Sequence, residues 1–159
     1  MCGILGFYSF ENKPYKSLEK SLDFLNSRGP DALGIWEDEY VYLGHRRLSI
    51  IDLDERSNQP MFSNCNRYII VFNGEIYNYQ ELRNELKDYN FNTKSDTEVL
   101  LALYSIYKEK MLVKLKGMFS FIIWDKIEKI SFVARDAYGI KPLYIGKLNN
   151  GLLLSSQVS

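Results

Sequence analysis

The hydrophobic positions of this chain follow two spacings, one typical of β-strands and one typical of helices. Continuous apolar and β-branched runs indicate buried strands, and polar segments rich in turn residues separate them. The run at 68–72 is expected to end at a turn formed by Asn73 and Gly74. The runs at 118–124 and 130–134 are joined by a short polar segment, which predicts a hairpin. The predicted strands lie at 3–8, 41–43, 48–51, 68–72, 118–124, 130–134, 143–145 and 152–155.

Helical signals occupy three other segments. Leucines at i, i+4 and i+7 within 18–25 define one face of a helix. Asn78 with Glu81, and Ser95 with Glu98, resemble capping boxes that open two further helices. The apolar face of the last helix is expected to contain Val99, Leu103 and Ile106. Helices in mid-chain, flanked by nearly continuous apolar strands, indicate strands that are covered on both sides.

Composition narrows the class of protein. The chain has 159 residues, which favours one domain, and 20 Lys and Arg balance 20 Asp and Glu. A formal net charge of +0 removes the electrostatic case for nucleic-acid or anionic-membrane binding. No apolar run approaches the roughly 20 residues that span a bilayer. One His and two Cys do not predict a metal site. We therefore expect a cytoplasmic protein that binds neither nucleic acid nor membrane.

Cys2 is the residue best suited to act as a nucleophile. Removal of Met1 would leave one residue that carries both a thiol and a free α-amine. The α-amine has an ordinary pKa of about 7.7–8.0, so part of it is neutral near pH 7 and can act as a base for the adjacent nucleophile. On position alone, a small buried Cys at the start of a strand remains the simpler interpretation.

A series of motifs favours a catalytic Cys2 over a merely buried one. In order along the chain they are MCGILGF, RGPD (28–31), GHRRLSIID (44–52), QP (59–60), FNGEIYNY (72–79), SDTEVLL (95–101), GMFSFIIWD (117–125) and RDAYGIKPLY (135–144). Together they resemble the glutaminase domain of class II glutamine amidotransferases, most closely that of glutamine-hydrolysing asparagine synthetases. The resemblance covers residues 1–159 and implies an α+β, four-layer αββα sandwich of two antiparallel sheets, the N-terminal nucleophile hydrolase fold, truncated at its C-terminus.

The resemblance also implies roles for particular residues. A thiolate would attack the glutamine amide, two donors would hold the oxyanion, and charged side chains would bind the α-carboxylate and α-ammonium groups. The implied catalytic residues are Cys2, Asn73 and Gly74, and the implied substrate-binding residues are Arg47, Glu75 and Asp96. His45 is expected to be structural and Cys65 an incidental thiol, while residues 28–31 are expected to shape a loop beside the site.

The partners follow from the same resemblance. Relatives continue into a synthetase domain that uses ATP and Mg²⁺, whereas no Ser-Gly-Gly run of that domain occurs here. We expect no cofactor in this domain, glutamine as its substrate, and a synthetase domain or subunit as its partner. An exposed sheet edge would permit a homodimer. Two alternatives stay open: a non-catalytic glutamine-binding or docking module, and an amidotransferase for another acceptor such as a sugar or polysaccharide.

Overall fold

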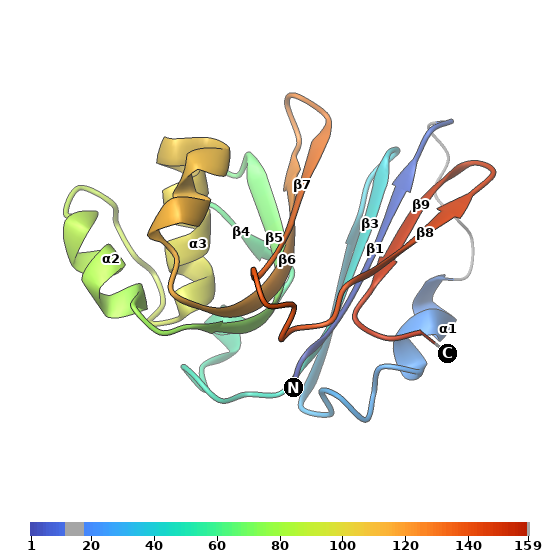
Figure 1. Cartoon of the computed structure of the whole chain (residues 1–159), viewed down its shortest axis with the longest axis horizontal. Helices are drawn as coiled ribbons and strands as arrows, with labels where there is room; N and C mark the ends of the chain where they lie inside the picture. Colours follow the sequence, from blue (N-terminus) through green and yellow to red (C-terminus); the bar gives the residue numbers. More distant parts are fainter. Residues whose placement is uncertain (12–17, 159) are drawn as a thin grey trace.

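The computed structural model describes residues 1–11 and 18–158, whose strands form two antiparallel sheets packed face to face (Figure 1). We call them sheet A, with the order β2-β3-β1-β9-β8, and sheet B, with the order β4-β5-β6-β7. The strands of sheet A are β1 (Gly3–Ser9), β2 (Ala32–Glu37), β3 (Val41–Arg47), β8 (Tyr144–Leu148) and β9 (Gly151–Ser155). Those of sheet B are β4 (Met61–Phe62), β5 (Tyr68–Ile76), β6 (Gly117–Asp125) and β7 (Ile130–Arg135).

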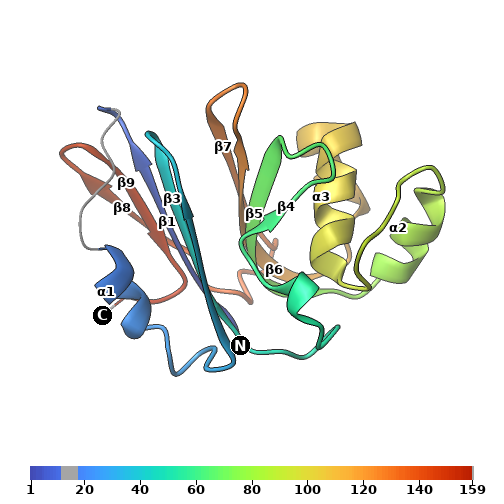
Figure 2. The same ribbon diagram turned by 180° about the vertical axis from the view of Figure 1, so that it is seen from behind.

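Helices cover the outer face of each sheet. The helix α1 (Leu18–Asp23) lies against sheet A, and α2 (Tyr79–Glu85) and α3 (Asp96–Tyr107) lie on the outer side of sheet B (Figures 1 and 2). In the described part of the chain, two short 3₁₀ helices are η1 (Glu55–Ser57) and η2 (Lys108–Lys114). The expected four-layer αββα sandwich is therefore confirmed. Over the described ranges, no helix is long and apolar enough to span a bilayer.

The strand β5 shows why sheet B needs nearly continuous apolar sequence. Successive side chains of a strand point to opposite faces. Ile69 and Val71 pack between the two sheets, whereas Ile70 and Phe72 pack in the core beneath the helices. Both faces of this sheet are buried, so strict alternation with polar residues would leave polar groups in an apolar core.

Several local predictions are confirmed. The strand at 3–8 is β1, the segment at 152–155 lies within β9, and β6 pairs with β7 as a hairpin. The Ser95 hydroxyl accepts a hydrogen bond from the Glu98 amide at 3.3 Å and caps α3. Val99 and Leu103 are fully buried, but Ile106 is 55% exposed, so its assignment to the apolar face was wrong.

Other local predictions were wrong because tertiary contacts overrode them. Asn73 and Gly74 do not end a strand: β5 continues to Ile76, with these two residues opposite Ser120 and Phe119 of β6. Residues 48–51 form a loop, and β3 includes the basic residues that precede it. The strand β2, whose exposure alternates along its length, was not predicted.

The capping box at Asn78 was also wrong. Asn78 does stand at the N-terminus of α2. Its side chain, however, donates to the Lys114 carbonyl at 3.0 Å and accepts from the Lys116 amide at 2.9 Å. Asn78 therefore ties the start of α2 to the segment before β6.

Candidate active site

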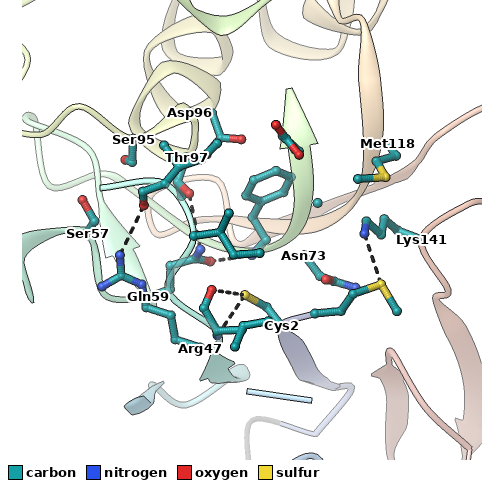
Figure 3. A pocket seen from close by; sticks show the side chains of 17 residues that line it. Cys2, Arg47, Ser57, Gln59, Asn73, Ser95, Asp96, Thr97, Met118 and Lys141 are labelled. Carbon is teal, nitrogen blue, oxygen red and sulfur yellow. Dashed lines mark hydrogen bonds between the residues drawn. The ribbon is translucent and has the colours of Figure 1, made fainter. Parts of the chain in front are cut away.

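A pocket lies at one end of the sandwich, where segments from both sheets and the start of α3 meet (Figure 3). It collects residues from the N-terminus, the end of β3, the last part of β5, and the first turn of α3. All six residues predicted for the site line this pocket: Cys2, Arg47, Asn73, Gly74, Glu75 and Asp96.

Cys2 directly precedes β1 and is held by the backbone of Leu48 and the side chain of Arg28. Its thiol donates to the Leu48 carbonyl, with 3.6 Å between sulfur and oxygen, and accepts from the Leu48 amide at 3.4 Å. Arg28 Nε donates to the Cys2 carbonyl at 3.2 Å. The 28–31 segment therefore contributes a direct contact to the backbone of Cys2.

The groups around Cys2 shift the pKa of its thiol in opposite directions. Burial raises the pKa of the Cys2 thiol above its usual range and is the largest influence. The hydrogen bond with Leu48 and the positive charges of the N-terminus and Arg47 lower that pKa, while Asp96 raises it. The thiol form is favoured overall, so nucleophilic attack requires a nearby base.

Asn73 contributes a side-chain amide to the wall of the pocket. The inward-facing positions of β5, Ile69 and Val71, point at sheet A, and alternation places Asn73 on the same face. Asn73 is 1% exposed, and its Nδ2 has no hydrogen-bond partner within the described ranges. An unpaired buried amide donor is costly unless a ligand supplies its acceptor.

Gly74 contributes a backbone donor at the open edge of β5. The strand β4 pairs with β5 only through Ile69 and Ile70, and side chains cap the edge beyond that point. The Phe72 amide donates to Gln59 Oε1 at 2.6 Å, and the Ile76 amide donates to Asp96 Oδ2 at 3.0 Å. Strand amides alternate in direction, so the Gly74 N–H faces this same edge, between those two capped amides.

Asp96 is a buried carboxylate in the first turn of α3. It is 4% exposed, and burial raises its pKa to about 6, with a smaller contribution from the charge of Glu75. The hydrogen bond from the Ile76 amide lowers that pKa but does not offset burial. Glu75 and Asp96 thus form an acidic side of the pocket that favours a cationic ligand group.

Arg47 is buried and organises the loop that follows it. Its Nη1 donates to the Asp54 carbonyl at 3.1 Å and to Asn58 Oδ1 at 2.7 Å. Its Nη2 donates to the Asp52 carbonyl and, more weakly, to the Ile51 carbonyl at 3.5 Å. The guanidinium group lines the pocket while holding residues 51–58 around it.

His45 is structural, as expected. It is 1% exposed, and its Nε2 lies 3.1 Å from the Phe72 carbonyl, so it links β3 in sheet A to β5 in sheet B. Burial lowers the pKa of His45 to about 4, which keeps the ring neutral near pH 7. A neutral ring then donates its Nε2–H to the carbonyl.

The sequence interpretation missed several pocket residues. Gln59 spans the pocket wall, since its Nε2 donates to Thr97 Oγ1 at 3.3 Å while its Oε1 caps β5. Met118 and Lys141 line the opposite side (Figure 3). Gln59, Met118 and Lys141 all lie in motifs that carry the family resemblance, which was the available signal.

Within the described residues, no group of three His, Cys, Asp or Glu side chains is placed to hold a metal ion. The pocket instead offers a thiol, two N–H donors, a guanidinium group and two carboxylates. This set suits the attack of a nucleophile on a carbonyl group in a small zwitterionic molecule.

Comparisons with known proteins agree with this chemistry. The model of the glutamine amidotransferase domain matches residues 1–159. Asparagine synthetase [glutamine-hydrolyzing] 1 of Bacillus subtilis is 47% identical over 99% of this chain and 26% of its own length. Asparagine synthetase B [glutamine-hydrolyzing] of Escherichia coli is 38% identical over 96% of this chain and 28% of its own length.

A solved structure supports the fold. Glutamine phosphoribosylpyrophosphate amidotransferase from B. subtilis superposes with a TM-score of 0.78 at 23% identity, covering 98% of this chain and 42% of the other. The present chain spans about a quarter of the length of the curated relatives it matches. The chain belongs to the glutamine amidotransferase domain family.

Proposed function

We propose that this domain hydrolyses the side-chain amide of glutamine through a thioester on Cys2 and supplies the ammonia to an ATP-dependent synthetase domain or subunit. The observation that carries the proposal is the meeting of the Cys2 thiol, the unpaired Asn73 amide and the Gly74 N–H in one pocket. A nucleophile and two donors for a developing oxyanion are the parts that acyl transfer requires.

The reaction begins once removal of Met1 exposes the α-amine of Cys2. The amine takes the thiol proton, and the sulfur attacks the amide carbon, whose oxygen becomes an oxyanion held by Asn73 and Gly74. The tetrahedral intermediate collapses as the ammonium group returns the proton to the leaving nitrogen, which departs as ammonia. Water then attacks the thioester with the amine again as base, and glutamate leaves as the thiol is restored.

Substrate recognition uses the charged walls of the pocket. Asp96 and Glu75 are suited to the α-ammonium group of glutamine, and Arg47 is suited to its α-carboxylate. The weakest bond of Arg47, to the Ile51 carbonyl at 3.5 Å, is the one that a bound carboxylate would replace. ATP and Mg²⁺ are expected to act in the synthetase partner, where the ammonia is consumed.

The test is covalent labelling combined with a mass measurement of the mature chain. A glutamine-like diazo-ketone should add one equivalent at Cys2 of a chain that begins with Cys2, and that chain should release glutamate from glutamine. Cys2→Ala should abolish both results. Cys65→Ala, the matched control at the exposed second thiol, should preserve both.

Two outcomes would contradict the proposed mechanism. One is full glutaminase activity in a chain that verifiably retains Met1, because the α-amine would then be blocked. The other is labelling that persists in Cys2→Ala. A chain that binds glutamine but releases no glutamate would instead support the non-catalytic alternative.

A further inference from the structure

Lys141 places a buried positive charge in the pocket. None of the roles assigned above uses this charge. The residue is 6% exposed, and its Nζ lies 3.2 Å from Met1 Sδ. Across the described residues, no carboxylate forms an ion pair with Lys141. A thioether sulfur is a weak acceptor, and lysine is rarely buried without a partner. The ammonium group therefore lacks an anion that would offset the cost of its burial.

The backbone at Lys141 is held firmly in place. Arg135 Nε donates to the Lys141 carbonyl at 2.7 Å, and the Lys141 amide donates to Asp136 Oδ2 at 3.0 Å. Asp136 is itself buried and also accepts from the Phe119 amide at 3.2 Å, which joins the segment to β6. Lys141 thus projects into the pocket from an ordered support and is not a mobile surface lysine.

The position of Lys141 indicates which anion it faces. In Figure 3, Lys141 and Met118 lie on the side of the pocket where Asn73 stands, whereas Arg47 and Gln59 lie on the opposite side. The substrate carboxylate is already assigned to Arg47. The negative charge on the Asn73 side is the oxyanion that develops when sulfur attacks the amide carbon.

We propose that the Lys141 ammonium group stabilises this oxyanion electrostatically and that removal of Met1 frees it to do so. The inference rests on the proposed glutaminase function. Lys141 transfers no proton: the sulfur–carbon bond forms, the carbonyl electron pair moves onto oxygen, and the lysine remains an ammonium ion throughout. A fixed charge in a water-poor pocket stabilises the transition state more than the neutral ground state.

The experiment compares three variants in the mature chain that begins with Cys2. Lys141→Met keeps an unbranched side chain of nearly the same length but removes its charge, and Lys141→Arg keeps the charge. Lys147→Met, on exposed β8, is the matched control for loss of a lysine. We expect Lys141→Met to lower kcat by roughly 10- to 100-fold with KM nearly unchanged, below the loss typical of a direct oxyanion donor. Lys141→Arg should retain most of the activity, and Lys147→Met all of it.

A binding measurement provides a readout independent of turnover. The aldehyde analogue of glutamine, glutamate γ-semialdehyde, can form a tetrahedral adduct with the Cys2 thiol, whereas glutamate cannot mimic that geometry. Lys141→Met should weaken binding of the aldehyde by about the factor lost in kcat and leave binding of glutamate unchanged. Thermal melts establish that each variant is folded, and Lys141→Gln replaces the Met variant if that protein does not fold.

The outcomes separate this inference from the proposed function. An increase in KM at unchanged kcat would overturn the inference, because Lys141 would then bind the substrate and not the oxyanion. Unchanged kinetics in Lys141→Met would overturn it as well. If the unsubstituted mature chain neither hydrolyses glutamine nor binds the aldehyde, the proposed function fails and this inference falls with it.

Discussion

At the scale of single residues, the pocket holds an ionisable group at an energetic cost. Asp96 is nearly inaccessible, and its pKa of about 6 lies above the value of 3.8 for an unperturbed aspartate. A carboxyl group whose pKa is raised by folding stabilises the folded state below pH 3.8, and this contribution is lost as the pH rises through 6. Near neutral pH the ionised Asp96 therefore lowers stability. Such a cost is common where a charge is kept for ligand binding.

Replacing Asp96 with asparagine tests whether this charge lowers stability while serving ligand binding. Asp96→Asn keeps an oxygen acceptor for the Ile76 amide but removes the buried charge. We expect the free energy of unfolding at pH 8 to rise by up to about 3 kcal/mol, with a smaller difference at pH 4, in urea titrations at both values. The KM for glutamine should rise, because the α-ammonium group loses its partner.

The control for Asp96→Asn is Asp88→Asn, at an exposed position, which should change stability little at either pH. In the unsubstituted mature chain, KM should also increase as the pH falls below about 6, where Asp96 becomes protonated. An Asp96→Asn protein that is less stable than its parent at pH 8 would show that the carboxylate is favourably held.

At the scale of secondary-structure elements, the site depends on how closely β5 approaches β6. Gly74 stands opposite Phe119, and a Cβ atom at Gly74 would lie 2.2 Å from the Met118 carbonyl oxygen and 2.7 Å from the Phe119 Cα. Those neighbours are backbone atoms in a paired strand and cannot rotate away. Glycine is therefore required by contact, and the contact keeps the Gly74 N–H at the edge of the pocket.

Gly74→Ala should force the two strands apart. We expect a loss of about 1–3 kcal/mol in the free energy of unfolding, the usual cost of overpacking. Glutaminase kcat should fall more than KM rises, because the displaced N–H meets an oxygen that is charged only in the transition state. Denaturant titration and steady-state kinetics measure the two effects.

Gly146→Ala provides the matched control on β8. A Cβ atom there would approach the Leu153 carbonyl oxygen no closer than 4.0 Å, an ordinary contact. This variant should be neutral or slightly stabilising, because alanine restricts the unfolded chain. If Gly74→Ala were as stable and active as Gly146→Ala, the tight packing of β5 against β6 would not constrain the site.

At the scale of the whole molecule, the two sheets are joined near the pocket by a buried polar contact. His45 of β3 donates to the Phe72 carbonyl of β5, one residue before Asn73. The surrounding inter-sheet contacts are largely apolar and non-directional, while this hydrogen bond specifies how the sheets align. The alignment brings Cys2, next to β1 of sheet A, into the same pocket as Asn73 of sheet B.

The buried His45 should make stability depend on pH. Its pKa is lowered to about 4, so its contribution is fully present above the ordinary value of 6.5 and is lost as the pH falls through 4. We expect this residue to account for up to about 3 kcal/mol of lost stability on acidification. Asp96 acts in the opposite direction, so the quantity to measure is the difference between the parent and His45→Gln at each pH.

His45→Gln keeps a neutral N–H donor and cannot titrate. At pH 7.5 its free energy of unfolding should be lower than that of the parent, because the packing of the ring is lost. At pH 4 it should approach or exceed that of the parent, because only the parent loses stability as His45 titrates. A constant difference between the two proteins from pH 7.5 to pH 4 would show that His45 does not titrate on unfolding.

The local chemistry of the chain was enough to determine much of this picture. Continuous apolar runs predicted β1, β6 and the first part of β5 because strands buried on both faces need them. Ser95 capped α3 as its spacing with Glu98 indicated. The order of short motifs identified the family and the six residues that the fold brings into one pocket. These features depend on residue type and spacing along the chain.

Tertiary structure decided the rest. Asn73 and Gly74 look like a turn in sequence, yet pairing with β6 keeps them extended, because ladder hydrogen bonds outweigh local turn preference. Residues 48–51 look like a strand, but their backbone groups bond outside any sheet: Leu48 to the Cys2 thiol and the Ser49 amide to Asp31 Oδ2. The burial of the Lys141 charge without an anionic partner among the described residues became apparent only from the structure. Burial and the absence of a partner are properties of neighbours distant in sequence, and a pattern along the chain does not encode them.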